Sequence, residues 1–541
     1  MTDILLIQPP IRDFYLTAKR TIPYGLACMA TTLINDGFSV GILDALASSK
    51  SRILDLPDEL SYLSLYYAKA DQSPFALFGH FKHFGYSFEH IGKLARESQA
   101  FLVGISSLFT PYMAEAIKTA ETVKAYLPTC NIVVGGHHPT AQPESVMASP
   151  AVDFVLRGEG EVSIAMLASA VHSGERYDSI PGLVYRGSNG KLRINSPAIM
   201  RQLDQYPLPA THLIHHKFYK RAKRGSAVIV ASRGCPMKCT YCSVGAGSYL
   251  PFRRRSIESV IEEIESAIAT RDAGFIDFED ENLSLDRKWF ITLLQEIAKR
   301  FGENRLELRA MNGLYPPSLD DEVIKSMKAA GFKTLNLSLG SISTEQLRRF
   351  QRPAVGSAFD RALNLSKTYG LNGVGSIIIG APNQSATDSL SDLLFLAERR
   401  VLAGVSVFYP APGSLDYDLC AKLKILPAHF SCMRSSALPV SHTTSRLETV
   451  TLLRLGRILN FMKSLLDRDL SIPAPLPARA EIENTRDRIE IGKKLLQYFL
   501  HDGKIRGISR NGKIFEHHID IPLAHQFLEG LKTVDIRGST S

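Results

Sequence analysis

The chain has 541 residues, of which 45% are hydrophobic and 22% charged, so it can bury a large core and wholesale disorder is excluded. Its length suggests about three to four domains. The 63 basic and 54 acidic side chains leave a net charge of +9 without a long Lys/Arg block, so we expect no nucleic-acid partner.

The first predicted element is a strand at Ile4 to Ile7. Asp3 precedes it and no basic flank is present, so the segment does not resemble a signal peptide. No apolar run approaches the ~18 residues that cross a bilayer. We therefore expect a cytoplasmic protein without a membrane span.

Residues 1–165 alternate short apolar strands with helical stretches, a pattern that predicts a Rossmann-like parallel sheet with helices on both faces. The expected strands are Ile4 to Ile7, Ser39 to Leu43, Leu102 to Ser106, Ile132 to Gly135 and Asp153 to Leu156. Ligands bind such sheets at the carboxyl ends of the strands. Asp44, Ser106, Ser107, Gly135 and Gly136 lie there.

Residues 51–95 interrupt this pattern, and we expect an aromatic-rich helical insertion that packs on the core. Its aromatic residues include Tyr62, Tyr66, Tyr67, Phe75 and Phe78. Residues 166–225 are interpreted as a connector. Asn189-Gly190 accepts positive φ at both turn positions and predicts a hairpin between Leu183 to Arg186 and Lys191 to Asn195.

Residues 226–415 contain a second alternating series, which predicts six β/α units. The expected strands are Ala227 to Ala231, Phe275 to Phe278, Arg305 to Leu308, Thr334 to Leu339, Gly375 to Gly380 and Gly404 to Tyr409. Six units are too few for a closed eight-stranded barrel, so we expect a partial barrel with active groups at the strand carboxyl ends. Ser256 is the expected N-cap of the first helix.

Residues 416–541 change to a mainly helical rhythm. We expect helices at Leu447 to Leu466 and Arg486 to Leu500, then a hairpin around Asn511-Gly512 and a closing helix. The sequence therefore predicts a small C-terminal α+β domain.

Three of the seven cysteines, Cys235, Cys239 and Cys242, fall within eight positions directly after a predicted strand. Without a secretion signal, such clustering favours a metal site or catalysis over disulfides. Three thiolates can hold three irons of a 4Fe-4S cubane and leave the fourth iron open. Zinc normally takes four ligands, and no second pair follows nearby. Cysteines packed without a metal are the other alternative, although a strand-end loop is not a core position.

The CxxxCxxC spacing, with Tyr241 before the last cysteine, resembles the signature of radical S-adenosylmethionine (SAM) enzymes. The resemblance covers residues 225 to 415. It implies that the open iron chelates SAM and that an electron from the cluster cleaves it to a 5′-deoxyadenosyl radical. It also implies a low-potential electron donor such as a flavodoxin or ferredoxin.

The same resemblance implies further SAM contacts. Glu279 and Asp280 end the second strand, where the family presents polar groups to the SAM amino group; the alternative is that both are solvated acids. Gly340 stands where many relatives carry Glu, so Ser338 or Ser341 is expected at the ribose. Gly380 ends the strand that lies near adenine in the family.

Arg253, Arg254 and Arg255 follow the cysteine segment. They are candidates for binding a carboxylate or phosphate, and a solvated helix start is the alternative.

The N-terminal region also resembles a family. Ser106-Ser107-Leu108 followed by Gly135-Gly136 is similar to the SxL…GG pattern of cobalamin-binding Rossmann-like domains. In such a pattern a small hydroxyl residue lets the cofactor tail enter the sheet, and the glycines permit close backbone approach. Two more segments resemble the cobalamin-binding radical SAM enzymes: the one containing Tyr24 and Gly25, and the one containing Gly158, Glu159 and Glu161.

Members that bind cobalt through histidine carry DxHxxG, whereas this chain has Leu46 two residues after Asp44. The resemblance therefore implies that no imidazole from this loop binds the lower cobalt face. His137 and His138 follow the glycine pair, and we interpret them as hydrogen-bonding loop histidines rather than cobalt ligands. A domain that keeps the fold without its cofactor is the alternative.

The resemblance implies a cobalamin-dependent radical SAM methyltransferase that acts on an unactivated carbon of a small molecule. One SAM would methylate cobalamin, and a second would supply the radical that abstracts a substrate hydrogen. The alternative is a non-methylating oxidative cyclase or rearrangement enzyme, similar to the anaerobic magnesium-protoporphyrin ester cyclase. A carrier without catalysis is disfavoured by the whole β/α barrel.

The remaining thiols and the last histidine pair receive structural interpretations. Lone cysteines are usually small buried hydrophobes, which is our interpretation of Cys28, Cys130, Cys420 and Cys432. His517 and His518 are adjacent in a predicted strand, point to opposite faces and make a poor metal pair.

Overall fold

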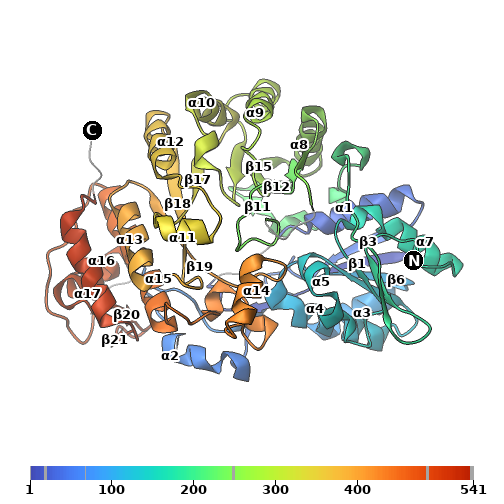
Figure 1. The fold of residues 1–541 in the computed structure, drawn as a ribbon, viewed down its shortest axis with the longest axis horizontal. Coiled ribbons are helices and arrows are strands. Elements are labelled where there is room, and N and C mark those ends of the chain that lie inside the picture. The colour runs from blue at the N-terminus through green and yellow to red at the C-terminus, as the bar shows by residue number, and fades with distance from the viewer. Residues whose placement is uncertain (1, 17–20, 68, 246–249, 483–486, 537–541) are drawn as a thin grey trace.

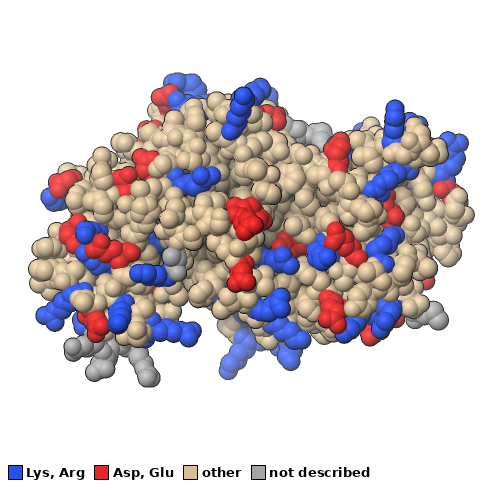
Figure 2. All heavy atoms as spheres, turned by 90° about the horizontal axis from the view of Figure 1, so that it is seen from below, with Lys and Arg blue, Asp and Glu red and all other residues tan. Residues whose placement is uncertain are grey.

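The fold was analysed in a computed structural model that describes residues 2–16, 21–67, 69–245, 250–482 and 487–536. Figure 1 shows the N-terminal sheet at one end of an elongated molecule, the second strand series in the middle and the C-terminal helices at the other end. On the face shown in Figure 2, basic and acidic side chains are interspersed, so the net positive charge is not gathered there into one patch. No helix in the described ranges combines the length and apolarity that crossing a membrane requires.

The N-terminal sheet has five parallel strands in the order β3-β1-β6-β7-β8, followed by the antiparallel β9 and β10. The bounds are β1 Ile4–Gln8, β3 Val40–Asp44, β6 Leu102–Ser106, β7 Asn131–Gly135, β8 Phe154–Leu156, β9 Leu183–Arg186 and β10 Leu192–Ile194. This confirms the predicted strands and hairpin. Because β3 and β6 flank β1 on opposite sides, the strand order reverses at β1, where sheets of this type bind ligands.

Helices cover both faces of this sheet, as predicted. One face carries α1 (Tyr24–Asn35) and α7 (Ile164–Ser173), and the other carries α3 (Phe88–Ser98) and α4 (Met113–Tyr126). Each face has its own buried cluster of apolar side chains. Two short helices, α5 (His137–Ala141) and α6 (Pro143–Met147), follow β7.

The predicted helical insertion at residues 51–95 is confirmed only in part. The segment contains a 3-10 helix (Asp58–Leu63), α2 (Ser64–Tyr67) and the start of α3 (Phe88–Ser98), but also β4 (Ser51–Ile53) and β5 (Lys82–Phe84), which form a small antiparallel sheet with β2 (Ile11–Asp13). Prolines 57 and 74 interrupt longer helices here. The predicted packing is confirmed, because Phe75 is buried in the largest core cluster. The other four aromatic residues pack against that cluster: Tyr62, Tyr66, Tyr67 and Phe78.

Six parallel strands form the predicted partial barrel. They are β12 (Arg224–Ile229), β15 (Ala273–Phe278), β16 (Glu307–Ala310), β17 (Thr334–Gly340), β18 (Asn372–Ile379) and β19 (Leu402–Val407). Single parallel bridges at Leu308–Phe332 and Leu314–Leu337 join the first three strands to the last three. The covering helices are α8 (Ile257–Arg271), α9 (Arg287–Phe301), α10 (Asp321–Ala330), α12 (Gly356–Thr368) and α13 (Ala386–Ala397). Ser256 caps α8 by accepting a hydrogen bond from the Ser259 amide, as predicted.

The C-terminal region packs directly on the barrel. Its elements are α14 (Leu415–Lys422), α15 (Arg446–Leu466), α16 (Arg488–Asp502), β20 (Arg506–Ile508), β21 (Ile514–Glu516) and α17 (Ile521–Thr533). The hairpin is confirmed, while Arg486, the expected start of the second helix, lies outside the described residues. Helix α15 lies against β19 and α13, and one continuous core joins this region, the barrel and the insertion.

Candidate functional site

The three clustered cysteines lie on a loop between β12 and α8. The base of the loop is a two-residue ladder, in which β13 (Ser232–Arg233) pairs with β14 (Arg253–Arg254). Cys239 is buried, Cys235 and Cys242 are half-buried, and all seven thiols of the chain are free. A side chain at Gly245 would come within 2.8 Å of the Cys239 carbonyl oxygen, so the loop turns back tightly on itself.

The three thiols lie within electrostatic reach of one another. Burial raises the pKa of Cys235 and of Cys242, and the neighbouring thiols raise both further. Within the described ranges, no three His, Cys, Asp or Glu side chains converge as the ligands of one metal ion would. Thiolates that each hold a different iron of a cubane do not have to meet at one point. The soft sulfur donors and their grouping on one loop therefore fit an iron-sulfur cluster.

Polar atoms without protein partners surround this loop. Asn282 lies against Cys235, and its buried Oδ1 has no partner. Arg352 donates to the Tyr241 hydroxyl at 2.9 Å and to the Ser338 carbonyl at 2.8 Å, while its buried Nε has no partner. Buried polar atoms are nearly always satisfied, so these two mark a place for a polar group bound from outside the chain.

Tyr241 anchors the loop rather than extending into open space. Its ring meets Phe350 edge-on with centroids 4.9 Å apart, and the next residue toward the N-terminus, Thr240, donates its amide to the Phe350 carbonyl. Sequence reasoning singled out Tyr241 but missed Asn282 and Arg352. Asn282 lies in the same acidic segment as Glu279, whereas no local pattern points to Arg352.

The two predicted acids have different environments. Asp280 is buried and accepts hydrogen bonds from the Ser232 hydroxyl at 2.6 Å and the Ala231 amide at 3.2 Å. Burial raises its pKa to about 7. Its carboxyl group thus ties the end of β12 to the end of β15, and the alternative of a solvated acid is wrong for it. Glu279 is exposed at the same strand end.

The three residues on later strands that were predicted to contact SAM also have different environments. Ser338 is half-buried beside the arginine that binds Tyr241. Ser341 is fully buried and donates to Asp392 of α13 at 3.0 Å, so its hydroxyl serves that helix instead of the cysteine loop. Gly380 has a φ of +72°, and a side chain there would press on Thr449 of α15. Of these three, Ser338 is linked to the cysteine loop through Arg352, which binds both its carbonyl group and the Tyr241 hydroxyl.

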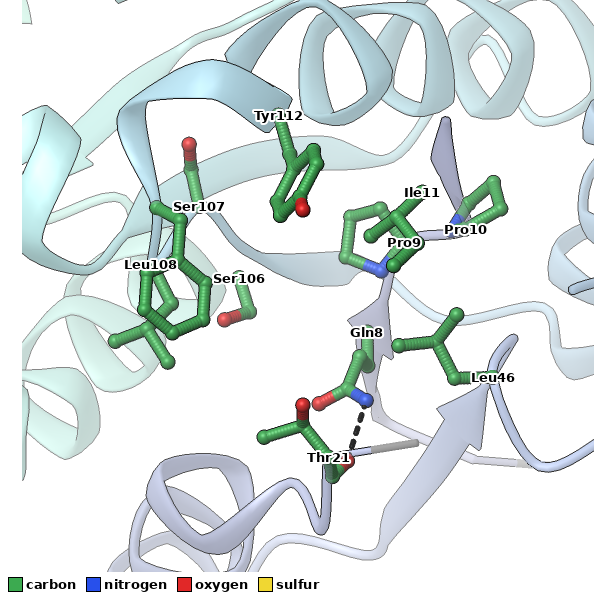
Figure 3. A pocket seen from close by; sticks show the side chains of 11 residues that line it. Gln8, Pro9, Pro10, Ile11, Thr21, Leu46, Ser106, Ser107, Leu108 and Tyr112 are labelled. Atoms are coloured by element: carbon green, nitrogen blue, oxygen red, sulfur yellow. Dashed lines mark hydrogen bonds between the residues drawn. The ribbon is translucent and has the colours of Figure 1, made fainter. Parts of the chain in front are cut away.

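A cleft opens in the N-terminal domain where the strand order reverses (Figure 3). It is lined by Gln8, Pro9, Pro10, Ile11, Thr21, Leu46, Ser106, Ser107, Leu108, Phe109 and Tyr112. Leu46 and the β1 end form one wall and the Ser106–Leu108 segment forms the opposite wall. The predicted ligand segments after β3 and β6 therefore meet at one cleft.

The wall at Ser107 is built for close approach. Ser107 is 3% exposed, and its hydroxyl has no partner in the described structure. Gly136 has φ 129° and ψ −171°, and a side chain there would come within 2.5 Å of the Ser107 carbonyl oxygen. Gly135 accepts the Ser107 amide at 2.7 Å. An unpartnered hydroxyl beside an obligatory glycine fits the predicted cobalamin.

Asp44 and Leu46 hold the facing wall. The Asp44 carboxylate accepts hydrogen bonds from the Leu46 amide at 2.9 Å and from the Tyr219 hydroxyl. Burial raises the pKa of Asp44. Leu46 reaches the cleft with an apolar side chain, so this position offers a bound cofactor no imidazole.

The other predicted N-terminal residues lie outside this cleft. His137 keeps contact with solvent, but the protein atoms around its ring displace part of its hydration and lower its pKa. His138 is buried between Thr110 and Ser145, consistent with a loop histidine that bonds locally. Tyr24 donates to Glu263 of α8 at 3.4 Å, and an added side chain at the exposed Gly25 would meet no atom.

The segment of Gly158 and Glu159 is the clearest departure from expectation. Glu159 is buried and accepts from Arg253 at 2.6 Å, from Arg233 at 3.3 Å and from the Met200 amide at 2.5 Å. Its carboxylate is therefore engaged by the two arginines at the base of the cysteine loop and by the connector, and its contact with cobalamin stays a prediction. Gly158, with φ +84°, forms a bridge to Ala198 of the connector.

The three consecutive arginines pair with internal carboxylates. Arg253 binds Glu159, Arg254 binds Asp286, and Arg255 binds Glu263. The expectation of a solvated helix start is wrong for Arg253 and Arg255, which are both largely buried.

Phenol side chains lie in the region between the cleft and the cysteine loop. The Tyr112 hydroxyl at the cleft lies 3.4 Å from the Tyr15 hydroxyl. Burial raises the pKa of Tyr409, with smaller contributions from Cys242 and Tyr15, so Tyr409 lies near both. Sequence reasoning missed these tyrosines. Tyr409 lies two residues after the end of β19, the sixth barrel strand, and that position was a usable signal.

The remaining thiols and histidines have structural environments. Cys28, Cys130, Cys420 and Cys432 are all buried. His517 binds Asp71 at 3.0 Å and His518 stacks on Tyr66, so the two rings have separate partners.

Comparisons with known proteins agree with this geometry. Residues 67–168 match the family described as B12 binding domain, and residues 229–395 match the Radical SAM superfamily. An uncharacterized methyltransferase, PH0819, of Pyrococcus horikoshii is 28% identical over 76% of this chain and 81% of its own length. The anaerobic magnesium-protoporphyrin IX monomethyl ester cyclase of Rubrivivax gelatinosus is 28% identical over 53% of this chain and 52% of its own.

The fold also has a solved counterpart. The radical SAM methyltransferase TsrM of Kitasatospora setae, solved with cobalamin and a [4Fe-4S] cluster bound, superposes with a TM-score of 0.58 at 18% identity. The superposition covers 78% of this chain and 75% of that one. At this identity the similarity shows the shared fold.

Proposed function

Because the chain belongs to the radical SAM enzymes that carry a B12-binding domain, we propose that it is a cobalamin-dependent methyltransferase acting on an unactivated carbon of a small molecule. The observation that carries the proposal is the pairing of two sites in one chain. A three-thiol loop lies at the barrel mouth and a cleft lies at the sheet switch point, and Tyr112, Tyr15 and Tyr409 lie in the region between them.

Residues at both sites fit the cofactors of this family. Cys235, Cys239 and Cys242 would hold a 4Fe-4S cluster, and the walls at Leu46 and Ser107 would hold cobalamin. When bound, the cluster and SAM supply a 5′-deoxyadenosyl radical and cobalamin supplies a transferable methyl group. SAM contacts are proposed for Glu279 and Ser338, which lie on strand ends around the loop.

The protein's own contribution is orientation and shielding. Arg352 fixes Tyr241 and the end of β17 at once, which holds the cysteine loop against the barrel. Tyr15 is half-buried and Tyr409 is 46% exposed between the two sites, and we propose that both border the substrate. Excluding water there would protect a reactive radical from side reactions.

Two parts of the proposal, the electron donor and the cellular location, concern the surroundings of the protein. An electron must reach the loop from outside the protein, and we propose a low-potential donor such as a flavodoxin or ferredoxin. The expected cytoplasmic location stays a prediction.

A second candidate function is oxidative cyclisation or rearrangement without methyl transfer. It is favoured by the identity of 28% with the anaerobic cyclase of Rubrivivax gelatinosus over 295 residues. Product analysis separates the two functions. S-adenosylhomocysteine formed together with 5′-deoxyadenosine supports methyl transfer, and deoxyadenosine alone supports the second candidate.

The central experiment replaces one thiol of the loop. Anaerobically reconstituted Cys239→Ala should lose the visible absorbance of the cluster and all deoxyadenosine formation, because one of the three irons held by cysteine would then lack its protein ligand. Cys130→Ala is the matched control, since Cys130 is equally buried but lies in the N-terminal domain. A Cys239→Ala protein that keeps the cluster and cleaves SAM would refute the assignment.

A further inference from the structure

The neck of the cysteine loop is a short and rigid element. Ser232 pairs with Arg254 and Arg233 pairs with Arg253 in antiparallel register, which closes the loop of residues 234–252 at its base. Gly234 has a φ of +81°, and any side chain there would collide with the Pro251 carbonyl group. Since Arg233 lies two residues before Cys235, the orientation of this rung sets where the first thiol points.

Both arginines of this rung bind carboxylates of the N-terminal domain. Arg253 donates to Glu159 at 2.6 Å, and Arg233 donates to Glu159 at 3.3 Å and to Glu161 at 2.5 Å. The side chains of Glu159 and Glu161 are each 6% exposed and that of Arg253 is 9% exposed. One buried positive charge, Arg253, and one half-buried positive charge, Arg233 with 23% of its side chain exposed, therefore face two buried negative charges across the domain boundary.

The connector adds a third segment to the same cluster. The Met200 amide donates to Glu159 at 2.5 Å, while the Met200 carbonyl accepts from Arg253 and its sulfur lies 3.1 Å from Arg233. Ala198 forms a bridge with Gly158, so the connector runs beside the carboxylate-bearing segment. Three segments distant in the sequence thus meet at the neck of the loop.

Charges placed in this way resist displacement. Ion pairs that are withdrawn from water keep their full attraction only while every partner stays in place, and loss of one partner leaves an uncompensated buried charge. The fixed fork of arginine donors adds direction to the attraction, because Arg233 directs one terminal nitrogen at Glu159 and the other at Glu161. The neck is therefore held in one orientation relative to the N-terminal domain.

We infer that Glu159 is a positioning residue for the cysteine loop, which clamps the Arg233–Arg253 rung from the N-terminal domain and keeps the three thiols in register for the cluster. This inference rests on the proposed function, because it presumes that the loop holds a cluster. It assigns the Gly158–Glu161 segment to the cluster side of the interface, although the segment belongs to the B12-binding domain.

The test measures cluster stability without cobalamin or turnover. Glu159→Gln keeps the side-chain shape and one carbonyl acceptor but removes the charge, and Glu144→Gln is the control because Glu144 is exposed in the same domain. Both variants and the wild type receive a reconstituted cluster. The rate of iron loss to a chelator and the electron paramagnetic resonance spectrum of the reduced cluster are then recorded. Cobalamin retention is measured in a separate titration.

We expect Glu159→Gln to lose iron about tenfold faster or more and to show a changed resonance spectrum, the scale at which residues that orient metal ligands act. Cobalamin retention and the control variant should match the wild type. Arg253→Lys should show an intermediate acceleration, because it keeps the charge and loses the second donor. It also supplies the measurement if Glu159→Gln does not accumulate as folded protein.

Three outcomes would overturn the inference. They are weaker cobalamin retention with an unchanged cluster, no change in either cofactor, and parallel loss of both, which would indicate a general defect of the domain interface. Wild-type protein that never holds a cluster would instead overturn the proposed function, so the two failures are distinguishable.

Discussion

Replacement of Gly136 by alanine tests the cleft of the N-terminal domain most directly. Gly136 lies at φ 129° and ψ −171°, a region essentially reserved for glycine, where another residue costs about 1–3 kcal/mol. The new methyl group would also come within 2.5 Å of the Ser107 carbonyl oxygen and 2.7 Å of its carbon. Backbone atoms cannot rotate away, so overpacking adds about 1–3 kcal/mol.

The combined cost of Gly136→Ala is therefore about 4 kcal/mol. For a domain of 150–250 residues, roughly 2–4 °C of Tm are lost per kcal/mol, so we expect Tm to fall by about 10 °C. The protein relieves the contact by moving the Ser107 wall, and about 1.4 kcal/mol of lost contact weakens cobalamin retention tenfold. Thermal unfolding and a cobalamin titration measure the two effects.

Gly174→Ala is the matched control for backbone strain. Gly174 also has a positive φ, +73°, but a side chain there would meet no atom within 4 Å. This variant should lose little more than the cost of the left-handed conformation, about 1 kcal/mol, and should keep cobalamin. The reasoning fails if Gly136→Ala unfolds at the same temperature as Gly174→Ala and binds cobalamin like the wild type.

Two further predictions concern the same domain. Burial raises the pKa of Glu115 from 4.5 to about 7, so its contribution to stability is full below pH 4.5 and is lost as pH rises through 7. Glu115→Gln should therefore stabilise the protein by up to about 3 kcal/mol at pH 8 and little at pH 4.5, and equal Tm changes at both pH values would contradict this. Leu46→His should add nitrogen splitting to the cob(II)alamin resonance spectrum, and an unchanged spectrum would argue against Leu46 facing the cobalt.

Local patterns predicted most of the scaffold. The apolar segments that became β1, β6 and β7 could be recognised because buried parallel strands are short, continuously apolar and bounded by turn residues. The strands inside the insertion at residues 51–95 could not be predicted, because its tyrosines and phenylalanines contact segments more than 350 residues later in the chain, as the hydrogen bond from Tyr62 to Ala437 shows. Helix and strand propensities over a short stretch of sequence contain no information on such distant partners.

The amino-acid order by itself determined that three thiols share one loop and that small residues end the strands at the cleft, since covalent spacing and strand periodicity are local properties. Only the tertiary structure decided which polar groups remain available. Glu159 reads as a ligand contact in the sequence, yet Arg253, 94 residues away, occupies its carboxylate. Asp280 and Ser341 are likewise engaged by Ser232 and Asp392. Buried charges and hydroxyls must find partners, and packing alone brings those partners together.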